Sequence, residues 1–405
     1  MSPAIFISAG EASGEHYGAL LIGALKKRLA AAGQTARFTG MGGTRMVEAG
    51  LEPVARSEDM AVMGLTEVLR HLPRIWWEFR KLKRAVREIR PDVAVLIDFP
   101  EIHFRLAREL HRLGVPVIFF VSPQLWAWKK YRIKLVKKYV RRMLVIFPFE
   151  EPFYRERGVE AEFVGHPLAE LPLPAISREQ FAVANGLEAG KGWMGLLPGS
   201  RPREIGDHLP EMLRAARELA ATGFQFMVPL APTLNDPQRD EVRRLVEIHG
   251  GGLEIRLVDD ARAALLHARA SVVASGTATV EAALMGNPFV VVYRVSPTTY
   301  AIAKRVVKVP HVAMVNLIAG KRIVPELIQN DFTAANIVQQ MEPLLPDGAS
   351  RQSMMQELAR IRSLLNSGSA RQGPESGGAI GRVAAITLEA AGIASPARTE
   401  EVVRH

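Results

Sequence analysis

The sequence predicts an α/β protein whose strands form two parallel sheets. Three observations support this prediction. Short apolar runs alternate with segments of helical length, the alternation occurs twice in 405 residues, and a proline-rich segment, Gly165–Ser177, separates the two occurrences. Apolar strands that are connected through helices pair in parallel. We therefore expect Rossmann-like domains at residues 1–168 and 169–345. We expect residues 346–405 to form C-terminal helices, which pack back on the N-terminal domain, and a flexible tail.

The apolar runs define the expected strands in order. Each is rich in Val, Ile, Leu or Phe and has a strand's length, and turn-forming residues follow many of them. The first half contains Ala4–Ser8, Ala36–Gly40, Val93–Ile97, Val115–Val121 and Met143–Phe147. The second half contains Trp193–Leu197, Phe226–Val228, Ile255–Leu257, Ser271–Ala274 and Phe289–Tyr293. From about Leu345 the pattern is helical, and Gly and Ser then become frequent at residues 366–378.

Composition excludes several classes of protein. Hydrophobic residues make up 48% of the chain and charged residues 23%, which are ordinary values for a globular protein. The chain has no cysteine, so disulfides, thiolate zinc sites and cysteine nucleophiles are excluded. No H-E-x-x-H spacing occurs among the 10 histidines, so no metal is indicated. Neither a signal peptide nor a transmembrane helix is predicted, and we expect a soluble protein that is not exported.

The basic residues are concentrated in two segments. Residues 70–90 contain eight basic and two acidic residues, and residues 129–142 contain eight basic and no acidic residues. Their combined charge exceeds the net charge of +10 of the whole chain, so the remainder is slightly acidic. This distribution indicates a local anionic partner rather than a generally basic protein.

The first basic segment has two interpretations. Its apolar residues recur at helical spacing, which is typical of an amphipathic helix that packs on the core, with Pro73 breaking or starting the helix. Alternatively, the segment forms a patch that binds an anionic membrane surface. The residues of that patch are Trp76, Trp77, Arg80, Lys81, Lys83 and Arg84. The charge also allows nucleic acid, but no nucleic-acid-binding motif accompanies it, and we expect none as a partner.

Ligands of open α/β sheets bind where the strands end. Two such places occur in the first half. The glycine-rich loop from Ser8 to Gly18 brings backbone N–H groups close to a ligand or forms a capped turn, and its spacing is not that of a dinucleotide fingerprint. Asp98 follows the strand Val93–Ile97. Its carboxylate either acts as a general base, with a pKa raised by burial, or caps the next helix.

The second half contains two strand–glycine–helix junctions. Gly199, Ser200 and Arg201 follow one strand, and this order suits a pyrophosphate, which backbone N–H groups and an arginine can hold. Gly276 and Thr277 follow another strand, and Glu281 lies one helical turn further on, where it can accept ribose hydroxyls. Ordinary capped turns are the alternative at both places.

At this point the chain resembles the lipid-A-disaccharide synthase family of bacterial glycosyltransferases over about residues 4–345. The resemblance depends on eleven segments. They are residues 9–14 (AGEASG), 61–64 (AVMG), 67–69 (EVL), 97–100 (IDFP), 121–128 (VSPQLWAW), 147–150 (FPFE), 165–167 (GHP), 196–201 (LLPGSR), 274–278 (ASGTA), 316–320 (NLIAG) and 325–327 (PEL).

The resemblance implies a GT-B fold, in which two Rossmann-like domains face a central cleft, with no metal and no cofactor. The implied donor is UDP-2,3-diacylglucosamine, the implied acceptor is 2,3-diacylglucosamine 1-phosphate, and the implied products are the β-1,6-linked disaccharide 1-phosphate and UDP. The N-terminal domain would bind the acceptor and the C-terminal domain the donor. Asp98 would be the catalytic residue. The donor contacts would be Gly199, Ser200, Arg201, Gly276, Thr277, Glu281 and Asn316, and the acceptor contacts would be Gly14 and Glu15.

The resemblance also implies a cytoplasmic protein that is peripheral on the inner face of the cytoplasmic membrane, and it allows a homodimer. The chain departs from the usual pattern of the family on the acceptor side, at Glu15, Glu101, His103 and Lys129. The sequence leaves open whether Asp98, Glu15 or His103 carries the proton. Candidates for an acyl-chain groove are Met60, Val62, Met63, Trp126 and Trp128, for which burial in a core is the alternative.

Three other functions remain open at this stage. The first is another GT-B transferase, of the kind that uses UDP-GlcNAc in cell-wall synthesis. The second is a UDP-sugar epimerase, which needs no acceptor. The third is a non-enzymatic protein that binds nucleic acid or an anionic membrane and releases no UDP.

Overall fold

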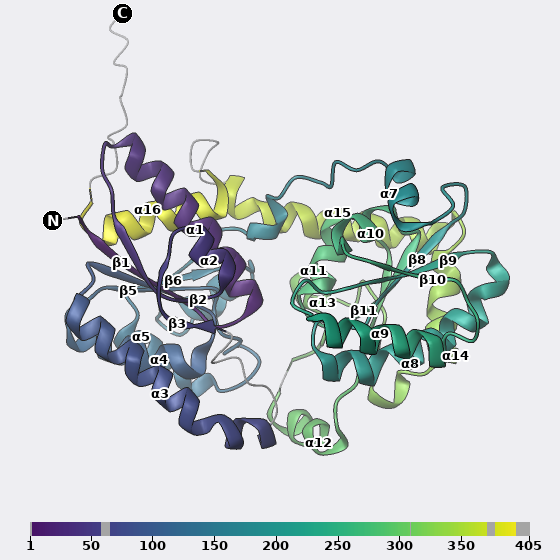
Figure 1. Cartoon of the computed structure of the whole chain (residues 1–405), viewed down its shortest axis with the longest axis horizontal. Coiled ribbons are helices and arrows are strands. Elements are labelled where there is room, and N and C mark those ends of the chain that lie inside the picture. Colours follow the sequence, from purple (N-terminus) through teal and green to yellow (C-terminus); the bar gives the residue numbers. More distant parts are fainter. Residues whose placement is uncertain (1, 58–64, 308, 371–376, 394–405) are drawn as a thin grey trace, which may run out of the picture. The chain divides into compact units, whose positions relative to one another are not determined.

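The computed structural model describes residues 2–57, 65–307, 309–370 and 377–393. The chain divides into two compact units. The first unit comprises Met1–Glu170 and Leu365–His405, and the second comprises Leu171–Leu364. Each unit contains one parallel sheet that is covered by helices (Figure 1).

The sheet of the first unit has seven strands in the order β3-β2-β1-β4-β5-β6-β7, and every pair is parallel. The strands are β1 (Ala4–Ala9), β2 (Arg37–Gly42), β3 (Glu52–Arg56), β4 (Val93–Ile97), β5 (Val117–Phe120), β6 (Arg142–Val145) and β7 (Ala161–Phe163). The central strands are buried on both faces because helices cover both, which explains their continuous apolar composition.

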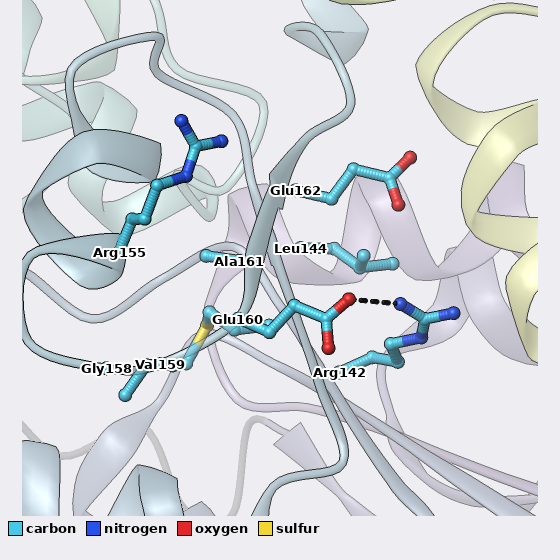
Figure 2. A pocket seen from close by; sticks show the side chains of 9 residues that line it. Arg142, Leu144, Arg155, Gly158, Val159, Glu160, Ala161 and Glu162 are labelled. Atoms are coloured by element: carbon cyan, nitrogen blue, oxygen red, sulfur yellow. Dashed lines mark hydrogen bonds and ion pairs between the residues drawn. The ribbon is translucent and has the colours of Figure 1, made fainter.

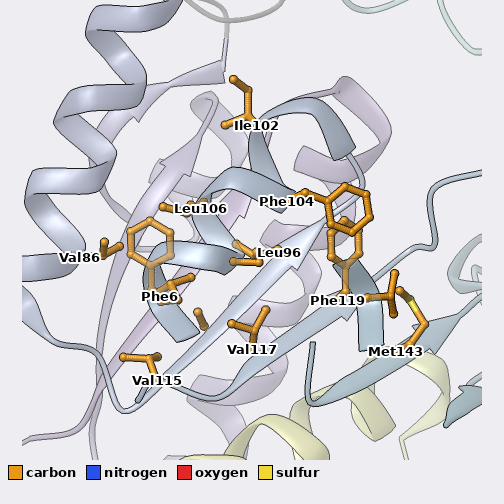
Figure 3. Packing of buried hydrophobic residues seen from close by; sticks show 14 of the residues in the cluster. Phe6, Val86, Leu96, Ile102, Phe104, Leu106, Val115, Val117, Phe119 and Met143 are labelled. Carbon is orange, nitrogen blue, oxygen red and sulfur yellow. The ribbon is translucent and has the colours of Figure 1, made fainter. Parts of the chain in front are cut away.

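The helices of the first unit lie on the two faces of this sheet. Figure 1 shows α1 and α16 on one face and α3, α4 and α5 on the other. The helices are α1 (Ala12–Ala31), α2 (Thr44–Glu48), α3 (Leu65–Ile89), α4 (Pro100–Arg112), α5 (Ile133–Tyr139), α6 (Glu150–Arg155) and α16 (Gly378–Ala390). A cluster of apolar side chains fills the layer between the sheet and helices α3 and α4, and Figure 3 shows Phe6, Leu96 and Phe119 within it.

The sheet of the second unit has six strands in the order β10-β9-β8-β11-β12-β13, again all parallel. The strands are β8 (Trp193–Leu197), β9 (Gln225–Pro229), β10 (Ile255–Val258), β11 (Ala270–Ala274), β12 (Phe289–Tyr293) and β13 (Glu326–Ile328). The helices are α7 (Arg178–Asn185), α8 (Pro202–Leu219), α9 (Asp236–His249), α10 (Ala261–His267), α11 (Thr277–Leu284), α12 (Pro297–Val306), α13 (Met314–Ala319) and α14 (Ala334–Met341).

Helix α15 (Ala349–Ala370) begins in the second unit, and its last residues belong to the first. Helix α16 packs against α1 and buries Ile380, Val383 and Leu388. Arg382 of α16 donates two hydrogen bonds to Glu162, at 2.6 and 3.1 Å. Helix α16 is therefore an integral part of the first unit.

The predicted class, α/β with two parallel sheets, is confirmed, and all ten predicted strands correspond to observed strands. Strands β3, β7 and β13 were not predicted. They lie at sheet edges, and two of them have only three residues, so they lack the long apolar run of a central strand. The prediction that Pro73 breaks or starts a helix is wrong, because α3 is continuous from Leu65 to Ile89. A helix can contain a proline if the fold compensates for one missing backbone hydrogen bond.

Candidate active site

In each sheet the strand order reverses at one point, the topological switch point. It lies between β1 and β4 in the first unit and between β8 and β11 in the second. Ligands of doubly wound sheets bind beyond the carboxyl ends of the strands at this point. Glu11 and Asp98 follow β1 and β4. The loops that begin at Pro198 and Ser275 follow β8 and β11. The structure thus brings the predicted loops of each unit together at its switch point.

Asp98 occupies a constrained position directly after β4. Its backbone φ is 50°, and Phe99 follows with φ 51° and ψ 59°, so two residues with side chains adopt the left-handed conformation. Such residues are uncommon and persist only where surrounding contacts hold them. The backbone N–H of Asp98 donates to the carbonyl of Phe120 at 3.0 Å, which ties the turn to β5.

The environment raises the pKa of the Asp98 carboxyl to about 7. Burial is the main cause, the nearby Glu11 carboxylate adds to it, and the backbone N–H of Phe99 opposes both. A carboxylate with this pKa is suited to accept a proton near neutral pH.

His103 stabilises the same turn. Its ring is fully buried, and its Nδ1–H donates to the carbonyl of Asp98 at 2.6 Å, so its Nε2 accepts from the hydroxyl of Ser8 at 2.8 Å. Burial lowers the pKa of His103 to about 4, so the ring is neutral at pH 7. Both ring nitrogens therefore take part in hydrogen bonds within the protein. Sequence reasoning missed this role, because Ser8 lies 95 residues away.

The predicted acceptor contacts, Gly14 and Glu15, lie in the first turn of α1. Gly14 is buried, and a Cβ there would lie 3.5 Å from Ala9 and Ile97, an ordinary contact distance. The Glu15 carboxylate accepts the backbone N–H of Arg45 at 2.9 Å, at the start of α2. Glu15 thus stabilises α2, and its contact with an acceptor stays a prediction.

The loop before α1 also contains a close approach. A Cβ on Gly10 would lie 2.4 Å from the ring of Phe99, the residue that follows Asp98. The loop therefore needs glycine at this position, and the contact joins the loop after β1 to the turn after β4.

In the second unit, Gly199 and Arg201 form the turn before α8. Gly199 has a φ of 120°, and a Cβ there would lie 2.6 Å from the Glu204 carboxylate, so glycine is required. Ser200 is exposed, and Arg201 is the N-cap of α8. The Arg201 guanidinium donates to Glu204 at 3.0 Å and is about half exposed, at 46%. The junction therefore offers a helix N-terminus and a guanidinium to an anion.

The adjacent junction contains Gly276, Thr277 and Glu281. Gly276 has a φ of 148°, and a Cβ there would meet open space. Both Gly276 and Thr277 are exposed at the start of α11. Burial raises the pKa of Glu281, Arg262 opposes this effect and Asp260 adds to it. Because β8 and β11 are parallel neighbours, these residues lie at the carboxyl ends of adjacent strands, as Arg201 does.

Asn316 is placed differently from the other predicted donor contacts. It is fully buried, and its amide donates to Val324 O at 3.0 Å and to Glu326 at 2.8 Å. Its carbonyl accepts the backbone N–H groups of Ile323 and Val324, at 2.8 and 3.0 Å. A direct contact to a nucleotide would require one of these bonds to break. In this structure Asn316 holds the segment that leads into β13.

Two buried groups near the strand ends were not predicted. His208 donates from Nδ1 to Pro198 O at 2.7 Å and accepts from the backbone N–H of Arg294 at 3.0 Å, so it fixes the ends of β8 and β12. Glu150 accepts Trp126 Nε1–H at 3.2 Å and the backbone N–H of Phe147 at 3.1 Å. Burial raises the pKa of Glu150 to about 8, and hydrogen bonds from these residues and Ser122 oppose the rise. Neither role is visible in a local pattern.

The predicted membrane patch lies on the outer side of α3. Trp76 and Trp77 are 57% and 58% exposed, and Arg80 lies over the Trp76 ring at 4.6 Å. Arg84 is also exposed, whereas Lys81 pairs with the buried Glu78 and Lys83 with the buried Glu109. Leu82 and Val86 face the core, so the amphipathic interpretation of this helix is confirmed.

The candidates for an acyl groove divide into two groups. Met60, Val62 and Met63 lie outside the described residues. Trp126 is buried and contacts the Phe149 ring edge-on, whereas Trp128 is 38% exposed. Burial in the core is thus the better description of Trp126.

A pocket of about 440 Å³ lies elsewhere in the first unit, and Figure 2 shows its lining. It is lined by residues at the amino ends of β6 and β7, whereas Asp98 follows the carboxyl end of β4. Arg142 pairs with Glu160 at 3.0 Å within it. Its position excludes it as the site of the Asp98 chemistry.

Neither a metal centre nor a membrane span is present in the part of the chain that the structure describes. No group of three or more His, Asp or Glu side chains is arranged to hold a metal ion within residues 2–57, 65–307, 309–370 and 377–393. Within the same ranges, no helix combines the length and apolarity that crossing a bilayer requires.

Comparisons with known proteins agree with this geometry. A family model described as lipid-A-disaccharide synthetase matches residues 5–374. A lipid-A-disaccharide synthase of Acidobacterium capsulatum is 60% identical over 374 residues, which are 90% of this chain and 92% of that protein. A protein of the same name from Koribacter versatilis is 49% identical over 364 residues, which are 90% of this chain and 94% of that protein.

Solved structures show the same fold at low sequence identity. UDP-GlcNAc 2-epimerase from Neisseria meningitidis gives a TM-score of 0.60 at 13% identity, covering 96% of this chain and 100% of that chain. The calicheamicin glycosyltransferase gives a TM-score of 0.55 at 19% identity, covering 95% and 99%. The predicted GT-B fold class is therefore confirmed.

Proposed function

Because the chain belongs to the lipid-A-disaccharide synthase family, we propose that it joins two acylated glucosamines in an inverting transfer. The donor is UDP-2,3-diacylglucosamine, the acceptor is 2,3-diacylglucosamine 1-phosphate, and the products are the β-1,6 lipid A disaccharide 1-phosphate and UDP. The observation that carries this proposal is Asp98 at the switch point of the first sheet, with its pKa raised to about 7.

Asp98 is assigned the role of general base. The primary hydroxyl of the acceptor attacks the anomeric carbon of the donor, and the bond from that carbon to the UDP oxygen breaks. Asp98 takes the hydroxyl proton, which requires a distance of about 2.6–3.2 Å in the reacting complex. The sugar passes through an oxocarbenium-like transition state, as in glycoside hydrolysis. The bonds of His103 and Glu15 to other groups support Asp98 over these two residues.

The second unit is assigned the donor nucleotide. The N-termini of α8 and α11 present backbone N–H groups at one sheet edge, and Arg201 adds a positive charge there. These groups would stabilise the negative charge that develops on the departing UDP. Glu281, whose carboxylate has no hydrogen-bond partner among the described residues, is suited to accept the two ribose hydroxyls. Asn316 would act indirectly, by holding the segment before β13.

The substrates of this reaction carry acyl chains, so the enzyme must work at a lipid surface. The exposed Trp76 and Trp77 on α3, next to Arg80 and Arg84, are suited to the interface of an anionic membrane. We assign this face of α3 to the inner surface of the cytoplasmic membrane.

A UDP-sugar epimerase is the strongest alternative function, because solved epimerases share the fold. Fold similarity at 13% identity does not distinguish the two activities. Relatives at 60% and 49% identity favour the synthase.

UDP release decides between these functions. The purified protein is given the diacylated UDP-sugar with and without the monosaccharide 1-phosphate, and the products are identified by mass spectrometry. We expect release that depends on the acceptor, with formation of the disaccharide. Conversion of the UDP-sugar to an isomer without acceptor would establish the epimerase, and UDP binding without either reaction would contradict the proposed transfer.

A further inference from the structure

A cluster of charged side chains lies beside Asp98 and has no role so far. Glu101, in the first turn of α4, accepts hydrogen bonds from Lys129 at 2.8 Å and from both terminal nitrogens of Arg132, at 3.1 and 2.5 Å. Lys129 and Arg132 belong to the segment after β5, the strand that pairs with β4. The cluster therefore lies on the side of the sheet where the strands end, as Asp98 does.

The charges of this cluster do not balance. Two cations share one carboxylate, and residues 129–142 contain no acidic residue of their own. Lysine and arginine together have about eight N–H donors, whereas one carboxylate offers about four acceptor sites. Arg132 and Lys129 attract the Glu101 carboxylate strongly enough that its pKa is lowered, although burial acts to raise it. The cluster thus holds an oxyanion and keeps a surplus of positive charge.

The burial of the three side chains differs in a way that suits exchange of the anion. The Arg132 side chain is 13% exposed and the Lys129 side chain 26%, whereas the Glu101 side chain is 54% exposed. The cations are therefore fixed by the fold, and the carboxylate is the member that can rotate into solvent.

The backbone at Lys129 is also constrained. Its φ of 52° is left-handed, and its ammonium lies 3.9 Å from the centre of the Trp128 ring. A lysine in this conformation is strained, and such residues gather at binding and catalytic sites.

We propose that Lys129 and Arg132 bind the phosphate of the acceptor, and that the Glu101 carboxylate occupies their site when the acceptor is absent. This inference depends on the proposed function, in which the acceptor is a sugar 1-phosphate. The reacting C6 hydroxyl and the C1 phosphate are attached through the two carbons that flank the ring oxygen, so a cation site near Asp98 but separate from it is what the acceptor requires. A guanidinium holds phosphate through two parallel hydrogen bonds, as it holds Glu101.

A lipid headgroup offers the same phosphate chemistry. Cations that bind a bilayer surface need to be exposed, as Lys130 and Lys134 of the same segment are. The low exposure of Arg132 favours a small ligand that enters the site.

The first experiment compares two acceptors. The KM is measured for 2,3-diacylglucosamine with and without its 1-phosphate, in the wild type and in Lys129→Gln and Arg132→Gln. Loss of a charged hydrogen bond should raise the KM for the phosphorylated acceptor by about tenfold or more. The KM for the acceptor without phosphate, and the affinity for UDP, should stay the same. An equal rise in both KM values would overturn the assignment.

Glu101→Gln should change phosphate binding in the opposite direction. Removal of the competing carboxylate should strengthen inhibition by inorganic phosphate and by glucosamine 1-phosphate, and it should lower the KM for the phosphorylated acceptor. A purely structural ion pair predicts a lower melting temperature and no gain in phosphate binding, and that result would refute the phosphate site.

The second unit offers a matched control. Glu357 also accepts from one lysine and one arginine, Lys321 at 2.5 Å and Arg360 at 3.0 Å, but both cations are about half exposed. Lys321→Gln and Arg360→Gln make the same charge changes and should leave the acceptor KM unaltered.

Two further measurements separate the possible outcomes. Binding to phosphatidylglycerol vesicles that falls in Arg132→Gln, with an unchanged KM, would assign the cations to lipid headgroups instead. If the wild type shows no UDP release that depends on the acceptor, the proposed transfer fails. Calorimetric titration of Glu101→Gln with glucosamine 1-phosphate then still tests the phosphate site. Binding that is lost when Arg132→Gln is added to this variant supports the site. Absence of binding to Glu101→Gln rejects it.

Discussion

Asp98 combines a left-handed backbone, burial and a neighbouring carboxylate, Glu11. Asp98→Asn keeps the shape of the side chain and removes its ability to take a proton. We expect turnover to fall by a factor of about 10² to 10⁴, with the affinity for UDP retained. In the wild type, kcat/KM should rise with pH through a midpoint near 7, because the carboxyl must lose its proton to act as a base.

Glu11 provides the control for this pH dependence. Glu11→Gln removes a negative charge that raises the pKa of Asp98, so the midpoint of the acidic limb should move to lower pH. Turnover in Asp98→Asn equal to that of the wild type would remove Asp98 as the base, whatever the pH profile.

Glu150 makes the stability of the first unit depend on pH. Its pKa is about 8 in the folded protein and near the ordinary value of 4.5 in the unfolded chain. A raised pKa means that the folded state binds the proton more tightly. The resulting stability is fully present below about pH 4.5 and is lost as the pH rises through about 8. The free energy of unfolding falls by up to about 1.4 kcal/mol per pH unit within this window. Between pH 5 and 8, the melting temperature of the wild type should therefore fall relative to that of Glu150→Gln.

Glu109 is a second buried glutamate of the same unit. It should make stability depend on pH in the opposite direction. Burial acts to raise its pKa, but Arg87 and Lys83 outweigh this effect and lower it. The stability that it contributes is present above the ordinary pKa and is lost in acid. Glu109→Gln should thus be destabilising at pH 7 and have little effect near pH 3. If the melting temperature of each variant differs from that of the wild type by the same amount at every pH, both assignments are contradicted.

At the scale of elements, α3 separates a core-facing side from an exposed side. Arg80 and Arg84 are exposed, so Arg80→Gln with Arg84→Gln should leave the fold intact. Each lost charge should weaken binding to phosphatidylglycerol vesicles by about 1 kcal/mol, roughly a factor of five. Trp76→Ser with Trp77→Ser should weaken binding independently of salt. Sedimentation with vesicles at two salt concentrations measures both effects.

Helix α9 supplies a control with the same chemistry. Arg243 and Arg244 are exposed and pair with carboxylates three residues before them, as Arg84 pairs with Glu88 four residues after it. Arg243→Gln with Arg244→Gln should leave vesicle binding unchanged. If these substitutions weaken binding as much as those on α3, general charge rather than α3 attracts the membrane.

The elements that sequence predicts well are the ones that are buried on both faces. Strands such as Val93–Ile97 and Phe289–Tyr293 are continuous apolar runs because helices cover both sides of the sheet. The edge strand Glu52–Arg56 contains charges and a proline, so no apolar run marks it. Helix α3 contains a proline, and only tertiary context decides whether such a helix continues.

At the scale of the whole molecule, the loops after the strands were predictable, whereas the contacts that shape them were not. Gly199 and Gly276 have positive φ values, which glycine in a strand–helix junction indicates. The left-handed Val121 has no such signal, because a β-branched residue rarely adopts that conformation, and the enrichment of aspartate there is too small to single out Asp98. The roles of Ser8 and Asn316 depend on partners that only the folded chain brings together.

The C-terminal helix connects the two parts of the first unit, because α16 returns to pack on α1 at the beginning of the chain. Val383 is fully buried in this contact. Val383→Asp places an unpaired carboxylate there, which should destabilise the first unit by several kcal/mol. The second unit holds its own core and the residues assigned to UDP, so UDP affinity should be retained while synthase activity falls at lower temperatures than in the wild type. Calorimetry with and without UDP measures the two effects. Met355→Asp, at an exposed position of α15, is the control and should leave both unchanged. Loss of UDP affinity in Val383→Asp at temperatures where the second unit is folded would show that the two units are not independent.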